Sequence, residues 1–463
     1  MQISVLNGTY SEGGDYRTSY PVNYVPVPKA HGLSMGYLRP AEGINLFSTV
    51  TGKIRGGVNW QEKAYYVCGN EVRRVNADGT TTLLDTITAD GKPVRFAFSF
   101  DRLGIASGGN LYYLSGEVIT QVTDTDLGTV NDVRYLAGYF LTTDGEFIIQ
   151  TRLIDPTAVT PYTYGSSEID PDPIVGLLVN RNELHAVNRY TIETFAVTGG
   201  LDSTLEYFAF ARINGAVIQK GAVGRDAACI YNEAIAFVGS GRNESPAVYL
   251  GENAQTIKLS TREIDQILAE YTAEQLETVV VETRTDKAHK FLYIHLPDRT
   301  LVYDSASSIV MEQPVWHVLT GALDGWGQYR GRYMVWAYNK WLIGDPESGR
   351  IGYLTPDSAD QWGEQVRTEF STVITWNENG GAVFHGLELQ VLNSANTSEK
   401  IAASYSTDGR NWSQDRWAKE FQRRIVWMQQ GFMQNWRAYR FRSTSKAMLS
   451  VARLDAKMEE LIP

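Results

Sequence analysis

The stretch AYYVCGNEVRRVNADGTTTLL, residues 64 to 84, holds three short runs of alternating or apolar residues separated by two turn signals. The turn signals are Gly69-Asn70 and Asp78-Gly79, whose residues tolerate the positive φ angles of tight reversals. A succession of strand, turn, strand, turn and strand is the pattern of an antiparallel meander. The stretch therefore predicts one small sheet.

The same unit recurs along the chain, at intervals of roughly 35 to 60 residues. The repeats lie at 103–122, 132–150, 173–197 and 227–251, and a last pair lies at 290–304 and 329–354. Because each small sheet can bury its faces only against its neighbours, the repeats predict a mainly β protein with a β-propeller. We expect about six blades; seven stay open because the last pair supplies one blade or two. A large sandwich is the alternative fold.

We expect three regions along the chain. Residues 1–55 form an N-terminal extended segment that closes or docks, residues 56–360 form the propeller, and residues 361–463 form a β-sandwich-like domain. The last region contains alternating strands such as GLELQVL, KIAASYS and RAYRFRS.

One helical insertion, at about 260–284, interrupts the propeller. Its apolar residues have helical spacing, and two capping boxes open its two parts. The apolar stripe is Ile264, Ile267, Leu268 and Tyr271, and the boxes are Ser260 to Glu263 and Thr272 to Gln275. An amphipathic helix in this place is expected to pack on the flank of the propeller.

The composition excludes several classes of protein. Of 463 residues, 43% are hydrophobic and 21% charged, and no apolar run approaches the ~20 residues of a membrane span. The two cysteines, Cys68 and Cys229, exclude a disulfide framework and are expected to be buried thiols. A net charge of −11 argues against a whole surface made to bind nucleic acid.

Charge is distributed unevenly, because residues 410–453 carry ten Lys or Arg against Asp415 and Glu420. That stretch has a net charge of +8, which leaves −19 for the rest of the chain. It is either a solvated sheet face with arginines stacked on tryptophans, or a docking surface for an acidic partner or DNA phosphates. The residues proposed for docking are Arg410, Arg416, Arg423, Arg424, Trp427, Trp436, Arg437, Arg440 and Arg442.

Residues 290–304, KFLYIHLPDRTLVYD, place His295, Asp298 and Asp304 in a predicted β-hairpin. A general base needs an orienting carboxylate and a nucleophile or substrate within reach, and this stretch shows neither. We therefore expect these three residues to brace the hairpin. No catalytic residue is predicted.

The sequence offers no set of metal ligands and no cofactor motif. The six histidines are scattered, and no Walker loop or dinucleotide fingerprint is present. The acidic run of Glu168, Asp170 and Asp172 lacks the glycine of a calcium loop and is stiffened by prolines. The stretch from Ser406 to Trp412 is similar to the Asp-box of sialidase-type propellers, which is a structural turn. No metal or cofactor is expected.

Four segments together resemble the packaged-DNA stabilisation protein, the tail hub or nozzle subunit of short-tailed (podovirus-type) bacteriophages. The segments are MGYLRPAEGI (35–44), AEYTAEQLETVVVETRTDKAHKFLYIHLPDRTLVYD (269–304), PVWHVLTG (314–321) and RRIVWMQQGFMQNWRAYRFRS (423–443). Their order and spacing agree with that family across most of the chain.

The resemblance implies a structural virion protein of the phage tail, assembled in the host cytoplasm and without enzymatic activity. It implies a propeller-based hub in a six-fold ring below the portal and its adaptor, which retains packaged double-stranded DNA and carries it during ejection. Tail fibres or tailspikes attach to such hubs, and a needle or plug closes the tip. A glycan-binding or glycan-cleaving phage propeller and a host-receptor-binding module are the alternatives.

Overall fold

The computed structural model describes residues 2–3, 20–29, 32–199, 206–377, 380–392 and 399–461. It divides into two compact units. The blade unit consists of Leu46–Thr283 and Arg330–Tyr353, and the sandwich unit of Met1–Asn45, Arg284–Tyr329 and Leu354–Pro463. The three regions predicted from the sequence stay a prediction.

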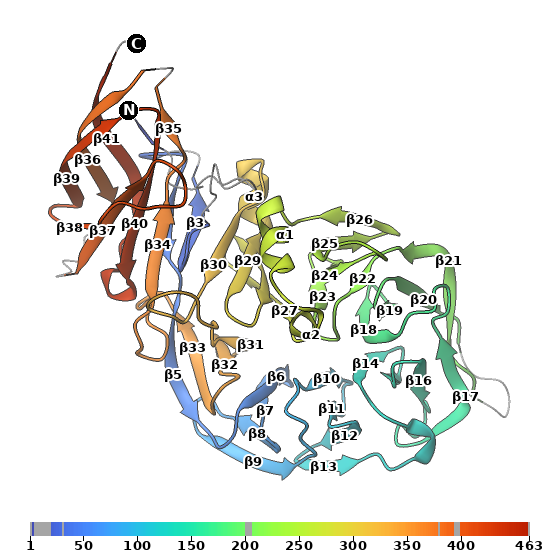
Figure 1. The fold of residues 1–463 in the computed structure, drawn as a ribbon. Helices are drawn as coiled ribbons and strands as arrows, with labels where there is room; N and C mark the ends of the chain where they lie inside the picture. The colour runs from blue at the N-terminus through green and yellow to red at the C-terminus, as the bar shows by residue number, and fades with distance from the viewer. Residues whose placement is uncertain are drawn as a thin grey trace. The chain divides into compact units, whose positions relative to one another are not determined.

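Between Gly43 and Thr355 the described chain forms seven sheets of four or five strands (Figure 1). The first sheet contains β6 (Ile54–Trp60), β7 (Lys63–Cys68), β8 (Glu71–Val75) and β9 (Thr81–Thr86), and the second contains β10 (Arg95–Phe98), β11 (Leu103–Ser107), β12 (Asn110–Ser115) and β13 (Val118–Gln121). The third contains β14 (Asp132–Leu136), β15 (Tyr139–Thr143), β16 (Phe147–Thr151) and β17 (Val159–Ser166). The fourth contains β18 (Ile174–Asn180), β19 (Glu183–Asn188), β20 (Ile192–Val197) and β21 (Phe210–Ile218). The fifth sheet contains β22 (Gly221–Ala222), β23 (Ala228–Tyr231), β24 (Ala234–Ser240), β25 (Ala247–Glu252) and β26 (Gln255–Lys258). The sixth contains β27 (Val280–Asp286), β28 (His289–His295), β29 (Thr300–Asp304) and β30 (Trp316–Leu319). The seventh contains β31 (Arg332–Ala337), β32 (Lys340–Gly344), β33 (Arg350–Thr355) and β5 (Gly43–Thr49).

Residues 64–84 form β7, β8 and β9, and β6 adds a fourth strand before them. About six blades were expected and seven were left open, because the repeats at 290–304 and 329–354 could supply one blade or two. They lie in two separate sheets. The second of these takes its fourth strand, β5, from near the start of the chain, and a distant strand of this kind leaves no local signal in the sequence.

Buried side chains fill the spaces between successive sheets of the blade unit. Tyr113 of β12 packs against Phe140 of β15 with ring centroids 4.8 Å apart, and Leu141 and Phe195 lie in the next cluster along the chain. Each sheet is therefore covered by its neighbours in chain order, as a propeller requires.

The predicted turn at Asp78-Gly79 has the backbone geometry that such pairs favour, and other Asp-Gly pairs of the chain share it. Gly79, Gly91, Gly145 and Gly409 have φ of 86°, 75°, 106° and 72°. The first two strands of a sheet are joined by non-glycine residues with positive φ in some sheets, for example Arg181 at 47° and Asn182 at 64°. Such turns contain no Asp-Gly pair, so a search for Asp-Gly pairs in the sequence predicts only some of the turns.

The insertion contains two short helices, α1 (Arg262–Ala269) and α2 (Ala273–Glu277). The capping box of Thr272 and Gln275 is confirmed. The first predicted capping box, Ser260 to Glu263, is wrong. The side chain of Thr261 caps α1, and the hydroxyl of Ser260 donates a hydrogen bond to Asp265. The predicted end of the helical insertion, at about residue 284, is also wrong.

Residues after α2 form strand β27 instead of helix. Val279, Val280 and Val281 are β-branched and buried, which favours a strand. The remaining helices are α3 (Ser305–Met311) and the two single turns η1 (Thr125–Leu127) and η2 (Ser445–Ala447).

The C-terminal part of the sandwich unit consists of two sheets that enclose one core. One sheet contains β1 (Gln2–Ile3), β3 (Tyr24–Pro28), β4 (Gly36–Pro40), β41 (Val451–Glu460), β36 (Ala382–Val391) and β39 (Arg424–Met433). The other contains β34 (Arg367–Ser371), β40 (Trp436–Thr444), β37 (Lys400–Ser406), β38 (Arg416–Lys419) and β35 (Thr375–Trp376). The core between them is aromatic, with Phe370 stacked on Phe441 at 5.0 Å.

The N-terminal strands complete the first of these two sheets. Strand β3 pairs with β4, and β4 and β1 pair with β41 near the end of the described chain. Tyr24 and Leu38 are buried in the sandwich core as a result.

Candidate functional site

The hairpin formed by β28 and β29 is present where it was predicted. His295 is fully buried, and its Nδ1 lies 2.9 Å from Oγ1 of Thr300 on the facing strand. Asp298 lies in the turn and pairs with Arg299 at 2.8 Å.

Asp304 ends β29 and begins α3. It accepts hydrogen bonds from the backbone of Lys290 and Ala306 and from Nδ1 of His289, the last at 2.7 Å. Burial would raise the pKa of Asp304, but the hydrogen bonds from His289 and Ser307 lower it overall. The carboxylate therefore joins strand and helix, and it binds His289 rather than His295.

Five charged residues of the blade unit form a buried group that we call the central cluster: Arg95, Asp132, Arg134, Arg225 and Asp226. Nε of Arg95 lies 2.9 Å from Asp226 and 4.0 Å from Asp132. Arg134 pairs with Asp132 at 3.1 Å, and Arg225 with Asp226 at 3.1 Å. The residues come from β10, β14 and the turn before β23, so the cluster joins three sheets.

Backbone groups complete the central cluster. Arg225 donates to the carbonyls of Pro93 and Asn131, at 2.6 and 3.0 Å, and Asp132 accepts from the backbone N–H of Leu177 on β18 at 2.9 Å. Burial would lower the pKa of Arg95, but Asp226 and Asp132 raise it overall, so Arg95 stays charged. Paired and hydrogen-bonded charges of this kind hold elements in register.

A cavity of about 230 Å³ lies beside the central cluster. Its lining comes from β6, β10, β14, the turn before β23, β27 and β31: Gly56, Gly57, Val58, Pro93, Val94, Arg95, Phe96, Arg134, Asp226, Val280, Val281, Glu282 and Tyr333. Glu282 accepts the backbone N–H of Tyr333 at 2.8 Å. The carboxylates of the cavity are thus bound to arginine or backbone N–H groups, an arrangement that connects sheets.

Metal binding has no support among the residues that the structure describes, where no three His, Cys, Asp or Glu side chains group together. Asp170 pairs with Arg242 at 2.8 Å, and Asp172 accepts from the backbone of Tyr190 at 2.6 Å. The two acids of the 168–172 run therefore serve the fold. His31 lies outside the described residues.

Two members of the predicted docking set, Trp427 and Arg437, are buried, with 3% and 1% exposure. The indole Nε1 of Trp427 donates to the carbonyl of Arg416 at 2.8 Å, and its ring packs against Phe441. A buried side chain cannot meet a partner, so both residues leave the docking set.

Arg437 shares the core with Tyr439 because both face inward from β40. Its guanidinium donates to the carbonyls of Gln430 and Phe432, each at 2.7 Å, and lies 4.0 Å from the ring centre of Tyr405. It satisfies carbonyls of β39 where that strand bulges.

Arg416 has the same role at the rim of the sandwich. It is exposed, yet it donates to the carbonyls of Met428 and Gln429, each at 2.7 Å. Gln429 has a φ of 53°, so these carbonyls lie at the bulge. Its guanidinium is therefore committed to the backbone of β39.

Arg410, Arg423 and Arg424 are exposed. Arg424 lies 3.6 Å from Glu388, a pair with little net strength at the surface. Arg410 follows Asp408, which accepts the backbone N–H of Arg410 at 2.8 Å and stabilises the turn of the Asp-box-like stretch.

Arg440 and Arg442 face outward from β40, and Trp436 is half-buried at its start. Arg442 pairs with Asp415, while Arg440 lies 4.3 Å from the ring centre of Trp412. The docking set therefore splits into arginines that satisfy the fold and arginines that face solvent.

Sequence reasoning missed Arg367 and Glu369 of β34. Both lie beside Arg442 and Thr444 in the register of β34 and β40, and they are 3.8 Å apart. They precede the basic stretch in sequence by more than forty residues, so charge counting over 410–453 could not find them. Only the alternating pattern of RTEFS marks them as a strand with one polar face.

Comparison with known proteins decides the family. The model of the family described as "Bacteriophage P22 Gp10, beta-propeller" matches residues 1–359, and that described as "Bacteriophage P22 Gp10, beta-sandwich" matches residues 367–459. The chain belongs to the P22 Gp10 family. A curated relative in this family, tail hub protein gp10 of Salmonella phage P22, is 27% identical over 488 residues, covering 99% of each chain.

Membership in the P22 Gp10 family confirms the predicted resemblance and the predicted fold, a propeller followed by a β-sandwich. It also confirms the predicted class, a structural protein of the phage tail hub and not an enzyme. The chain is therefore a component of a phage tail. No helix of the described chain has the length and apolar character needed to span a membrane.

Two solved structures show a lower likeness to this chain. The Neurospora crassa Pan2 WD40 domain has a TM-score of 0.44 and 10% identity, covering 68% of this chain and 95% of its own. The N-terminal domain of Nup159 has a TM-score of 0.42 and 8% identity, covering 71% and 97%. Neither bears on what this chain does.

Proposed function

We propose that this tail hub protein forms a six-fold ring below the portal and its adaptor, retains packaged DNA and carries it during ejection. The observation that carries the proposal is the match to the P22 tail hub protein over 99% of both chains. Propeller and sandwich are both included in that match, so the whole chain is expected to share one role.

The path proposed for DNA lies between copies of the protein. The cavity beside the central cluster, at about 230 Å³, has room for on the order of eight water molecules at about 30 Å³ each, and not for a duplex. Arg95 and Arg134 reach into it and are held by Asp132 and Asp226. Double-stranded DNA therefore needs a lumen that several copies enclose.

Charge supports passage without sequence-specific binding. The chain outside 410–453 has a net charge of −19, and negative groups repel phosphates. A lumen lined mainly by that part of the chain would let the duplex slide.

The proposed partners are further copies of the chain, the portal and adaptor, tail fibres or tailspikes, and a tail needle or plug. The arginines of the docking set that are neither in the core nor bound to backbone carbonyls are proposed to meet one of them: the exposed Arg410, Arg423 and Arg424 and the half-buried Arg440 and Arg442. Assembly is proposed to take place in the host cytoplasm.

Electron cryomicroscopy of the phage particle tests the proposal directly. We expect density for six copies around the axis of the exit vertex, and we expect particles that lack the protein to lose their DNA after packaging. Particles that keep their genome without it, or density for it away from that vertex, would show the proposal to be wrong.

A further inference from the structure

The outward side of the sheet β34-β40-β37-β38 carries a row of arginines. In this sheet Tyr439 and Phe441 of β40 face the core, so Arg440 and Arg442 face outward by the period of two. The register places Ser371 and Ser404 on either side of Arg440. We call this side the arginine face: Arg367, Glu369, Ser371, Ala402, Ser404, Arg440, Arg442 and Thr444.

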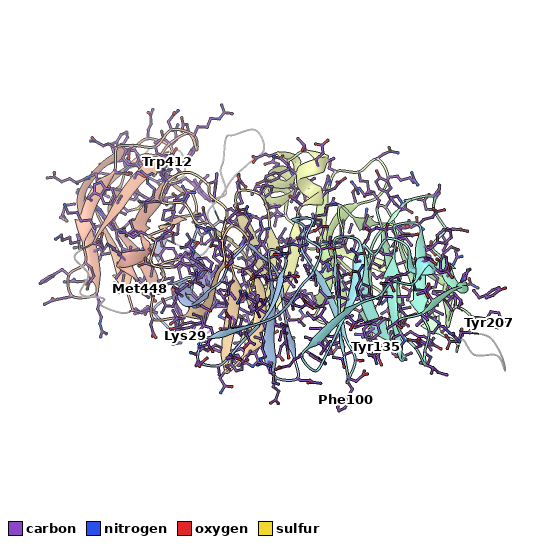
Figure 2. All side chains as sticks on the ribbon, turned by 90° about the horizontal axis from the view of Figure 1, so that it is seen from below. Lys29, Phe100, Tyr135, Tyr207, Trp412 and Met448 are labelled. Atoms are coloured by element: carbon purple, nitrogen blue, oxygen red, sulfur yellow. The ribbon has the colours of Figure 1, made fainter. Side chains whose placement is uncertain are left out.

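Positive charge exceeds negative charge on the arginine face. Its three arginines meet two carboxylates, Glu369 and the neighbouring Asp415, which pairs with Arg442. Arg440 has no ion pair or hydrogen bond from its guanidinium to a described residue, and it stacks on Trp412, which Figure 2 labels on the sandwich. Burial lowers the pKa of Arg440; the charges of Glu369 and Asp415 oppose this shift, and those of Arg442 and Arg367 add to it. The two carboxylates therefore offset only part of the positive charge of the three arginines.

Six polar atoms of the arginine face are buried without a hydrogen-bond partner in the described part of the chain. They are Nε of Arg367, Arg440 and Arg442, the hydroxyls of Ser371 and Ser404, and the hydroxyl of Thr444. A buried donor without an acceptor destabilises the fold, because it has lost its hydrogen bonds to water. All six can donate a proton, so what they lack is a ligand rich in acceptors.

We propose that the arginine face binds an extended, acidic segment of another virion protein, with Asp or Glu at alternating positions. In an extended segment, side chains two residues apart lie about 6.6 Å from each other, as do Arg440 and Arg442 along β40. Carboxylates at that spacing match both guanidinium groups at once. The inference rests on the proposed hub role and gives the exposed arginines a partner of defined chemistry.

A protein segment fits this face better than the backbone of DNA. Glu369 and Asp415 lie within the row of arginines, where they would repel a continuous line of phosphates. A peptide can place neutral residues opposite these two acids. The partly exposed guanidinium of Arg442 is the point on this face where such a segment can make contact first.

The test uses the full chain and two synthetic peptides of one composition. One peptide alternates Glu and Thr, and the other groups all Glu residues at one end. We expect fluorescence anisotropy to show tighter binding of the alternating peptide, and about tenfold weaker binding after R440Q together with R442Q. R453Q with K457Q, on the other sheet of the sandwich, removes the same charge and should leave binding unchanged.

Folding of the variants is checked by urea unfolding. Because the guanidinium of Arg440 makes no direct ion pair or hydrogen bond with a described residue, R440Q alone should keep or raise the urea midpoint while it weakens peptide binding several-fold. Equal binding of both peptides, binding insensitive to R440Q, or tighter binding of a short DNA duplex at the same arginines would overturn the inference. These assays need only the isolated chain, so their outcome is separate from the location of the protein in the particle.

Discussion

Arg437 shows how one buried residue can combine charge with structure. It lies in the aromatic core, where its guanidinium donates to two carbonyls of β39 and lies over the ring of Phe384. A guanidinium can do this because it presents several donors in one plane and stacks on aromatic rings. The residue therefore supports the bulge of β39 more than it supplies charge for binding.

Replacing Arg437 with Met is expected to destabilise the protein by about 2–4 kcal/mol, because two buried carbonyls lose their donor. Arg437→Lys should recover only part of this loss, since one ammonium group cannot span both carbonyls. Urea unfolding monitored by tryptophan fluorescence measures the change. R424M, at an exposed position of β39, serves as control and should change stability by less than about 0.5 kcal/mol. Equal stability of R437M and wild type would contradict this account.

Two buried histidines predict a dependence of stability on pH. Burial lowers the pKa of His185 to about 4 and that of His317 to about 3. Both are neutral in the fold, whereas the unfolded chain takes up their protons below about pH 6.5. Stability should thus be full above that pH and fall progressively as the pH drops, by about 2 kcal/mol per histidine between pH 7 and 5.

Urea unfolding of H185Q at several pH values checks this expectation, because Gln cannot titrate. The variant should lose part of the pH dependence, even if its stability at pH 7 is lower. His385 is exposed and near Glu459, so H385Q should keep the wild-type slope. A slope unchanged in H185Q would mean that this histidine is protonated in the fold.

At the scale of elements, the sequence predicts hairpins well and their assembly less well. The meander of 64–84 and the hairpin of 290–304 follow from alternation and turn residues, which act locally. Strand β5 joins β33, and β4 joins β41, across most of the chain, so no local pattern reveals them. The division of the basic stretch into inward and outward arginines could have been predicted from the alternation along β40. Arg437 lies two residues from Tyr439 and so shares its inward face, whereas Arg440 lies on the opposite face. The central cluster could not have been predicted, since its members are far apart in sequence and each has an ordinary local context.

Asp132 is the member of the central cluster on which several elements depend. It accepts N–H groups from β14 and β18 and pairs with Arg134. D132A is expected to cost about 3–5 kcal/mol, because it leaves buried arginines without a carboxylate. Urea unfolding measures this loss. D101A, which removes an exposed partner of Arg102, should cost less than about 1 kcal/mol. Similar losses in both variants would show that the central cluster is not a special support.

At the scale of the whole molecule, charge separates the sandwich from the rest of the chain. The stretch 410–453 carries +8, but Arg416 and Arg437 are bound to backbone and Arg442 to Asp415. The seven other cations of the stretch are outnumbered by the net charge of −19 on the rest of the chain, which repels phosphates. The molecule as a single copy is thus expected to be a poor binder of nucleic acid.

We expect the isolated chain to bind a short DNA duplex with a Kd of about 10⁻⁴ M or weaker at physiological salt. Electrophoretic mobility shift or anisotropy measures this. Lowering the salt should strengthen binding only slightly, because few counterions are released. A micromolar Kd would contradict the expectation and would indicate that a single copy of the protein binds the genome directly.

The pairing of β3 and β4 with β41 has a consequence for synthesis. The hairpin of β3 and β4 leaves the ribosome long before β41, the strand with which β4 pairs. Until β41 has been made, Tyr24 and Leu38 lack part of the sandwich core that buries them. A chain cut short before β41 would therefore lack a finished sandwich at both ends, and incomplete subunits would be kept from joining the tail.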